Sequence, residues 1–216
     1  MSNLKIGRMV LGSFQTNCYF IYREGVHGPE GLCPVILVDP AEKGAHIYHT
    51  MRQNGFQVAG ILLTHGHVDH IGGAVELGKL SGAQIYAGAE EENLLKDMQL
   101  NLSERFGMPL RVTADVWLRD GAECTIADMS FHVIATPGHT LGGCSYYFEE
   151  DGFLISGDTL FCESVGRTDF PTGSMSVLVH SIKHRLFSLP NNTIVYPGHG
   201  GSTTIGWEKE QNPFVI

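Results

Sequence analysis

Hydrophobic and polar residues alternate along two early segments, residues 4–11 and 17–22, with Gly12 and Ser13 near the break between them. A period of two is typical of strands with one buried face, so we expect two paired strands here. Two uninterrupted apolar runs follow at residues 35–38 and 58–64. Their length fits strands that are buried on both faces.

Apolar residues recur every three or four positions in four other segments, residues 45–53, 74–80, 91–106 and 174–189. This spacing predicts helices, the last of them with Ser174 as a candidate N-cap. Short apolar runs predict further strands at residues 84–87, 123–126, 130–136, 144–149, 153–156 and 193–196.

The order of these elements predicts the fold class. Each half of the chain carries strands followed by a helix, and neither half contains a linker. We therefore predict a single α/β domain over residues 1–216, in which two packed sheets are covered by helices, a four-layer αββα sandwich. The hydrophobic share of 43% is ample for the core of such a domain.

Charge and cysteine content narrow the partners and the compartment. The net charge of −9 and the lack of a basic stripe argue against nucleic acid as a partner. No apolar run approaches the ~18 residues of a membrane span. Five cysteines without a C-x-x-C spacing argue against a disulfide framework, and the first residues lack a signal-peptide pattern. We expect a cytoplasmic protein with no membrane partner, and leave its oligomeric state open.

Four potential metal ligands lie within six residues, directly after the buried run at residues 58–64. They belong to the segment Thr64-His65-Gly66-His67-Val68-Asp69-His70. In an extended chain, residues two apart share a side, so His65 and His67 can bind one ion together. Asp69 and His70 follow where the chain turns into the next helix and are candidates for a second ion.

Three later residues occupy the same kind of position. His139, Asp158 and His199 each follow a strand-like run, and a Pro-Gly pair precedes both histidines. Open α/β sheets place their sites at the carboxyl ends of strands, so we expect these residues to meet the first cluster. The alternative is a histidine-rich surface loop that binds metal adventitiously.

These motifs, in this order, resemble the metallo-β-lactamase superfamily over essentially the whole chain. The H-x-H-x-D-H motif is followed by a G-H, a G-D and a final G-H pair. Residues 156–161 with 166–171, and residues 197–200 through 204–206 to 212–214, are similar to the glyoxalase II-like (hydroxyacylglutathione hydrolase-like) branch. The resemblance implies the metallo-β-lactamase fold.

The resemblance also implies the ligand sets. One ion would be held by His65, His67 and His139, the second by Asp69, His70 and His199, with Asp158 bridging both. Because all these ligands offer N or O atoms, two zinc ions fit, with iron or manganese as alternatives. Asp39 matches an early aspartate of the superfamily and either supports a ligand or simply forms a strand-end turn.

The implied reaction is hydrolysis of a small-molecule thioester such as S-(2-hydroxyacyl)glutathione. Two ions about 3.5–4 Å apart would share a hydroxide that attacks the carbonyl carbon, with Asp69 holding or relaying its proton. A thiolate leaves without a dedicated general acid because its pKa is near 8.5. The printed sequence ends two residues after Phe214, so we expect a form without the C-terminal helical domain of typical glyoxalase II enzymes.

The residues expected to contact substrate are less clear. Arg167 stands in a Gly-Arg-Thr-Asp sequence where typical glyoxalase II enzymes carry a lysine followed by aromatic residues. It is a candidate for substrate binding, and the alternative is an ion pair with Asp169. The apolar segment 91–110 either packs into the core or forms a lid.

Two alternative functions are carried forward. The sequence from Gly166 to Phe170 also resembles persulfide dioxygenases, in which a single iron would be held by His65 or an equivalent histidine, His139 and Asp158. The other alternative is a non-catalytic metal-binding module that retains the fold; the completeness of the seven ligands argues against it.

Overall fold

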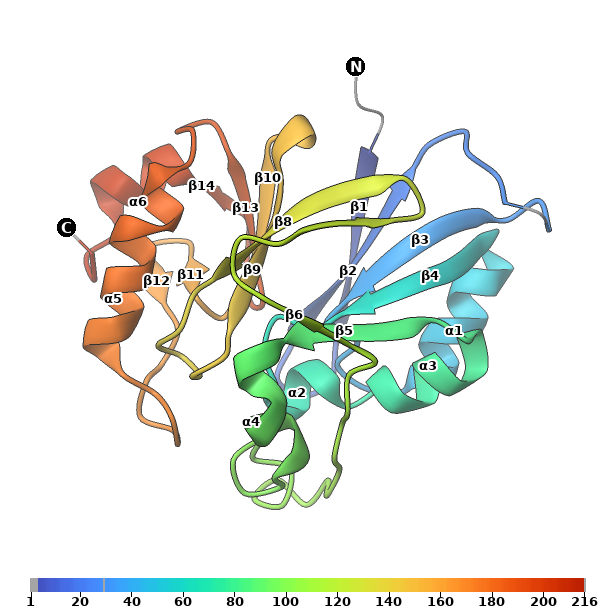
Figure 1. Ribbon diagram of the computed structural model, residues 1–216, viewed down its shortest axis with the longest axis horizontal. Helices are drawn as coiled ribbons and strands as arrows, with labels where there is room; N and C mark the ends of the chain where they lie inside the picture. The colour runs from blue at the N-terminus through green and yellow to red at the C-terminus, as the bar shows by residue number, and fades with distance from the viewer. Residues whose placement is uncertain (1–3, 29, 216) are drawn as a thin grey trace.

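Two six-stranded sheets face each other in the computed structural model, which describes residues 4–28 and 30–215 (Figure 1). The first sheet has the strand order β1-β2-β3-β4-β5-β6. Its strands are β1 (Leu4–Leu11), β2 (Thr16–Arg23), β3 (Cys33–Val38), β4 (Phe56–Leu62), β5 (Gln84–Gly88) and β6 (Val116–Leu118). The β1–β2 and β2–β3 pairs are antiparallel, and the pairs from β3 to β6 are parallel.

The second sheet has the order β14-β13-β10-β9-β8-β7. Its strands are β7 (Glu123–Ile126), β8 (Met129–Ala135), β9 (Cys144–Phe148), β10 (Phe153–Gly157), β13 (Ile194–Pro197) and β14 (Thr203–Thr204). Only the β10–β13 pair is parallel. A small hairpin of β11 (Leu160–Phe161) and β12 (Ser164–Val165) stands apart from both sheets.

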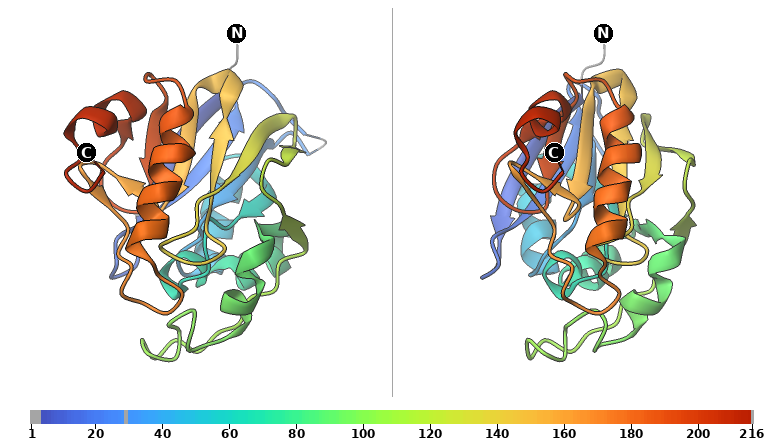
Figure 2. Two further views of the ribbon diagram at one scale, coloured as in Figure 1. Left: turned by 60° about the vertical axis from the view of Figure 1, so that its left-hand side comes forward. Right: turned by 90° about the vertical axis from the view of Figure 1, so that its left-hand side faces the viewer.

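Helices cover the outer faces of both sheets (Figures 1 and 2). The first sheet carries α1 (Gly44–Gln53) and α3 (Ala74–Ser81), with the short α2 (Val68–Ile71) and α4 (Glu92–Lys96) at the lower end in Figure 1. The second sheet carries α5 (Met175–His184) and α6 (Ile205–Gln211). Three single turns of 3₁₀ helix complete the elements: η1 (Ala89–Glu91), η2 (Glu149–Asp151) and η3 (Leu186–Ser188). The predicted four-layer sandwich is confirmed.

The side chains of β3 show why a strand that lies between two layers needs a continuous apolar run. Val35 and Leu37 of β3 pack with α1 and α3, whereas Ile36 and Val38 pack in the core between the sheets. Because successive side chains of a strand point to opposite faces, a strand covered on both faces must be apolar throughout. A third core, between the second sheet and α5, completes the layers.

The helix predicted over residues 91–106 is wrong beyond its first turns, because α4 ends at Lys96. The Asp97 side chain accepts hydrogen bonds from the backbone N–H groups of Gln99 and Leu100, at 2.8 and 3.2 Å. Such a bond offers the backbone an alternative to the helix, and Leu102 then adopts a positive φ of 66°. Residues 97–110 therefore run as an irregular segment, called here the 97–110 segment.

The helix predicted over residues 174–189 is also shorter than expected. It spans Met175–His184, and the turn η3 follows it. Ser174 is the N-cap residue, but its side chain makes no capping hydrogen bond.

None of the helices in the described part of the chain has the length and hydrophobicity of a transmembrane helix. The single domain over residues 1–216 stays a prediction, and its positions 1–3, 29 and 216 lie outside the described residues.

Candidate metal centre

All seven candidate ligands meet at one edge of the sandwich, where strands of both sheets end. His65 and His67 follow β4, and Asp69 and His70 lie in α2 directly after them. The other three come from the second sheet, in the loops after its strands: His139 after β8, Asp158 after β10 and His199 after β13. The convergence expected from the strand ends is therefore present in the structure.

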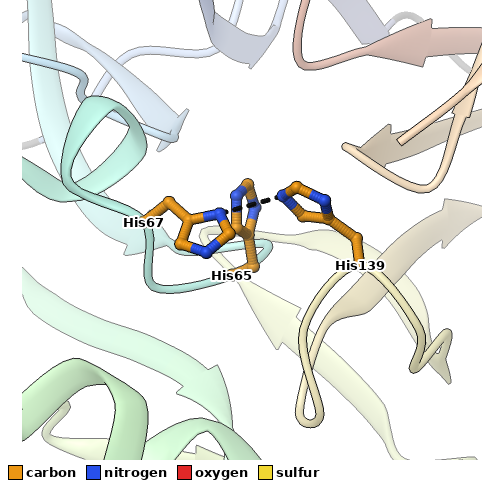
Figure 3. Close-up of side chains that lie close together, drawn as sticks. All are labelled: His65, His67 and His139. Atoms are coloured by element: carbon orange, nitrogen blue, oxygen red, sulfur yellow. Dashed lines mark hydrogen bonds between the residues drawn. The ribbon is translucent and has the colours of Figure 1, made fainter. Parts of the chain in front are cut away.

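One group of ligand atoms is formed by His65, His67 and His139, whose nitrogen atoms all lie within 4.8 Å of one another (Figure 3). All three side chains are buried. His67 Nδ1 lies 2.9 Å from His139 Nε2, the contact drawn as a dashed line in Figure 3. Two imidazole nitrogens at this distance need a proton or another cation between or beside them.

A second group is formed by Asp69, His70 and His199, again with ligand atoms within 4.8 Å of one another. His199 Nε2 lies 3.3 Å from Asp69 Oδ2 and 3.3 Å from His70 Nε2. His70 Nε2 lies 3.5 Å from the same oxygen of Asp69. The two groups together use every histidine of the sequence motif.

Asp158 lies between the two groups. Its Oδ2 atom is 3.7 Å from His139 Nε2 and 3.5 Å from His199 Nε2, and its Oδ1 atom is 3.4 Å from His70 Nε2. Gly198 leaves room for this carboxylate, because a Cβ atom at that position would lie 2.2 Å from Asp158 Oδ1. This position fits a carboxylate that bridges two ions.

Several buried polar atoms of this cluster have no hydrogen-bond partner, which tests whether metal ions fit. They include His65 Nε2 and Asp158 Oδ1. A buried polar atom without a partner costs free energy, so such atoms need an explanation, of which an ion is one. The nitrogen and oxygen donors match zinc, iron or manganese. The residues therefore fit the metal ions that the sequence implies.

A layer of hydrogen bonds behind the ligands orients the imidazole rings. Asp39 accepts bonds from the Thr64 backbone N–H at 2.8 Å and from the Thr64 hydroxyl at 2.6 Å, and lies 2.9 Å from His70 Nδ1. Thr64 Oγ1 in turn lies 3.1 Å from His65 Nδ1. When these rings are neutral with their proton on Nδ1, the Nε2 lone pairs of His65 and His70 face the site. Asp39 thus supports two ligands, as the first of its two interpretations predicts.

His139 is fixed in the same way by the backbone. Its Nδ1 atom lies 2.6 Å from the carbonyl oxygen of Arg167, which has only acceptor capacity. A proton therefore sits on Nδ1, and Nε2 points into the site, toward His67 Nδ1. The loop that carries Arg167 thus holds one ligand in its binding tautomer.

Charge differs between the two groups of ligands. Burial, followed by the neighbouring histidines, lowers the pKa of His65 well below its ordinary value, and burial and His139 lower the pKa of His67 to about 3. Burial also lowers the pKa of His70, but the carboxylates of Asp69, Asp158 and Asp39 outweigh it and raise the value to about 10. The second group therefore favours a positive charge at its centre.

The candidate general base Asp69 is held as a carboxylate. Burial raises its pKa, but the nearby His70 and His199 outweigh burial and bring the value below the ordinary range. The hydroxyl of Thr16, at the start of β2, donates a hydrogen bond to Asp69 Oδ2 at 3.1 Å. Thr16 was not predicted as a site residue, because nothing in the sequence near residue 16 resembles the ligand motifs.

Glu91 is a second residue that the sequence did not indicate. Its two carboxylate oxygens accept hydrogen bonds from the backbone N–H groups of Gly66 and Gly142, each at 2.8 Å. Gly66 stands between His65 and His67, and Gly142 belongs to the loop that carries His139. The buried Glu91 carboxylate therefore ties together two loops that supply the first group of ligands.

Arg167 forms the ion pair that was one of its two predicted roles. Its Nε and Nη2 atoms donate to the two carboxylate oxygens of Asp169, at 2.7 and 2.6 Å. The guanidinium carbon also lies 3.9 Å from the centre of the Phe170 ring, a cation–π contact. Substrate binding by Arg167 stays a prediction.

A cavity of about 350 Å³ opens onto the ligands. Leu102 and Phe106 of the 97–110 segment line it, whereas Leu94 and Leu95 of α4 are buried in the protein. Core packing therefore applies to the beginning of the segment, whereas its end lines the cavity. The lid stays a prediction.

Comparison with known proteins gives consistent matches. Residues 11–199 match the model of the family described as the metallo-beta-lactamase superfamily. A hydroxyacylglutathione hydrolase of Haemophilus influenzae, GloC, is 32% identical over 94% of this chain and 94% of its own. The crystal structure of the B3 metallo-beta-lactamase BLEG-1 superposes with a TM-score of 0.86 at 34% identity, covering 98% of this chain and 99% of that one. TTHA1623 in a di-iron-bound form has a TM-score of 0.81 at 32% identity, with 96% and 99% coverage.

Proposed function

This chain belongs to the metallo-β-lactamase superfamily, and we propose that it is a dinuclear metallohydrolase that cleaves small-molecule thioesters such as S-(2-hydroxyacyl)glutathione. The observation that carries the proposal is the position of Asp158, between two complete three-residue groups of ligands. The similarity to the Haemophilus influenzae hydroxyacylglutathione hydrolase supports the choice of substrate.

In this proposal His65, His67 and His139 would hold one ion, Asp69, His70 and His199 would hold the other, and Asp158 would contact both. We propose zinc, with iron or manganese as alternatives; the relative with a di-iron-bound form keeps iron open. When bound, the two ions supply Lewis acidity and bring the pKa of a water molecule in the site close to 7.

The protein's own groups orient and deprotonate the attacking water. Asp69 faces the cavity as a carboxylate, and the Thr16 hydroxyl holds its Oδ2 atom from behind. Such a carboxylate accepts a hydrogen bond from water, aligns it and takes its proton as the carbonyl is attacked. The thiolate then departs without a donor, because its pKa is already near 8.5.

A mononuclear iron site of the persulfide dioxygenase type would need only two histidines and one carboxylate. The second group of ligands would then have no metal role, although its atoms lie within 4.8 Å of one another. This favours the dinuclear proposal. The similarity to BLEG-1 makes a β-lactam the second substrate class to test.

The test combines metal analysis with a substrate panel on one preparation. We expect two metal equivalents per chain and release of free thiol from S-lactoylglutathione and other acyl thioesters. The panel includes a chromogenic cephalosporin, and glutathione persulfide with oxygen uptake as the signal. One iron per chain with oxygen uptake would establish the dioxygenase alternative, and two metals with no thioester turnover would reject the thioesterase.

Two matched histidine variants and one aspartate variant locate the activity. His67→Ala is expected to lose one metal equivalent and the thioesterase activity, whereas His180→Ala, on the exposed face of α5, keeps both. Asp69→Asn is expected to lower kcat by about 10²–10⁴-fold, the range for loss of a general base. Metal content is measured for every variant, so that loss of an ion is distinguished from loss of the base.

A further inference from the structure

The cavity above the ligands has a polar floor and apolar walls. Its floor consists of ligand side chains, and its walls come from six apolar residues in loops or the small hairpin: Phe14, Leu102, Phe106, Phe161, Val165 and Phe170. With a volume of about 350 Å³, the cavity has room for more than the reacting carbonyl group. Its walls therefore restrict what the rest of a substrate can be.

Two of these walls meet above the site although they are far apart in the sequence. Phe14, in the turn between β1 and β2, and Phe106, in the 97–110 segment, have ring centroids 4.9 Å apart at an interplanar angle of 76°. Each of these two phenylalanines has 39% of its surface exposed to solvent. Apolar surface that is exposed around a cavity gains free energy when a ligand removes it from water.

The wall around Phe170 carries two guanidinium groups, those of Arg167 and Arg105. Arg167 is the only arginine or lysine among the described residues that line the cavity, and its guanidinium is paired with the two oxygens of Asp169. The guanidinium also packs on the Phe170 ring at 3.9 Å. A polar or anionic substrate group at Arg167 would have to compete with Asp169, and the guanidinium carbon of Arg105 lies 5.5 Å from the centre of the Phe170 ring. The apolar surface that is open to a substrate is therefore that of Phe14 and Phe106.

We propose that the cavity binds a large apolar acyl group, branched, extended or aromatic, and that Phe14 and Phe106 determine this specificity. This inference rests on the proposed thioesterase function. The thioester carbonyl reaches the ligands on the floor, and the acyl side chain packs against the exposed faces of the Phe14–Phe106 pair. Hydrolysis then adds water across the C–S bond, giving a 2-hydroxy acid and a free thiol.

The test uses one carrier thiol and a graded series of acyl groups. The substrates are lactoyl, 2-hydroxyhexanoyl and mandeloyl thioesters of glutathione, and each kcat/KM is divided by the rate of spontaneous hydrolysis. Burial of one additional methylene group of the acyl chain is expected to raise this normalised kcat/KM by up to about fourfold. We expect the 2-hydroxyhexanoyl and mandeloyl esters to exceed the lactoyl ester at least about tenfold.

Three variants assign this preference to the walls. Phe106→Ala and Phe14→Ala are expected to reduce the ratio of mandeloyl to lactoyl turnover to below about threefold, because each lowers mandeloyl turnover more than lactoyl turnover. Met108→Ala is the matched control, because this residue is 41% exposed on the same segment and does not line the cavity. Equal turnover of all three esters, unchanged by either phenylalanine variant, would overturn the proposal.

Binding to the metal-free protein separates this proposal from the thioesterase function. Calorimetry is expected to give a Kd for 2-hydroxyhexanoate at least about tenfold below that for lactate, and Phe106→Ala removes the difference. If no thioester is hydrolysed but this difference in binding is found, the apolar site stands and the proposed reaction fails. If thioesters are hydrolysed and the two acids bind equally, the specificity proposal fails and the reaction stands.

Discussion

Replacing Glu91 by glutamine tests whether one buried carboxylate joins the two loops that carry the first group of ligands. In the native protein both oxygens of Glu91 accept a backbone N–H, one from Gly66 and one from Gly142. Glutamine keeps one acceptor of similar shape, but its NH₂ group faces the other N–H. One buried donor therefore loses its partner and meets a second donor in its place.

The expected magnitude follows from that single lost bond. A buried donor left without an acceptor costs about 1–3 kcal/mol. Because burial also raises the pKa of Glu91, the native carboxylate already bears a desolvation cost that glutamine avoids, and this keeps the loss within that range. For a chain of this length 1 kcal/mol corresponds to about 2–4 °C in Tm, so we expect Tm to fall by about 2–12 °C.

Thermal unfolding of the metal-free protein, followed by circular dichroism, measures this change directly. The matched control is Glu90→Gln, the neighbouring carboxylate, whose side chain is exposed. Metal titration by calorimetry gives a second signal, since His67 and His139 lie on the two loops that Glu91 joins. A Glu91→Gln protein that unfolds at the same temperature as Glu90→Gln and binds metal equally well would refute the argument.

Three further predictions concern other contacts. Asp39→Asn is expected to weaken metal binding about 10–100-fold in a metal titration, because it disturbs the bonds that orient two ligands. Asp120→Asn should remove less than about 1 kcal/mol, since its ion pair with Arg185 is partly exposed. The hydrogen bond from Arg185 lowers the pKa of Asp120. The stability from this ion pair is therefore present above the ordinary aspartate pKa and is lost as the pH falls through the lowered value. Denaturant unfolding at several pH values should show that the difference in stability between the variant and wild type disappears in acid. Gly44→Ala would place a Cβ atom 2.3 Å from a backbone oxygen of the loop before α3, and it should lower the free energy of unfolding by about 1–3 kcal/mol. In the control Gly201→Ala, the added Cβ atom meets nothing within 4 Å, so the free energy of unfolding should stay unchanged.

The sequence predicted those elements whose patterns extend over several residues. The alternating run at residues 4–11 and the apolar run at 35–38 correspond to β1 and β3, because burial on one or two faces determines such patterns directly. Strands of two or three residues, such as β6, β11 and β14, were not predicted, since they are too short to show a period. The helix at 91–106 was wrong because its apolar residues serve two purposes, core packing before Asp97 and cavity lining after it.

The seven ligand candidates could be predicted because their chemistry and their position coincide. Each is a metal-binding residue type that directly follows a strand, or the turn into α2, and strand ends meet at one edge of the fold. Thr16 and Glu91 lack such a local signal. Thr16 contacts Asp69 across 53 residues of sequence, and Glu91 contacts Gly142 across 51. Their roles depend on contacts that exist only after both sheets have packed.

The same difference explains why the reaction class can be inferred from the sequence more readily than the substrate. The ligands stand at the ends of strands whose register and packing the cores determine, so their relative positions change little without loss of the fold. The cavity walls come from the turn that carries Phe14, the 97–110 segment, the β11–β12 hairpin and the loop that ends at Phe170. These segments carry few backbone bonds of the sheets, and a replacement there alters the space above the metal ligands without moving them. Substrate preference in this chain is therefore expected to change with Phe14 and Phe106, and metal binding is expected to remain constant.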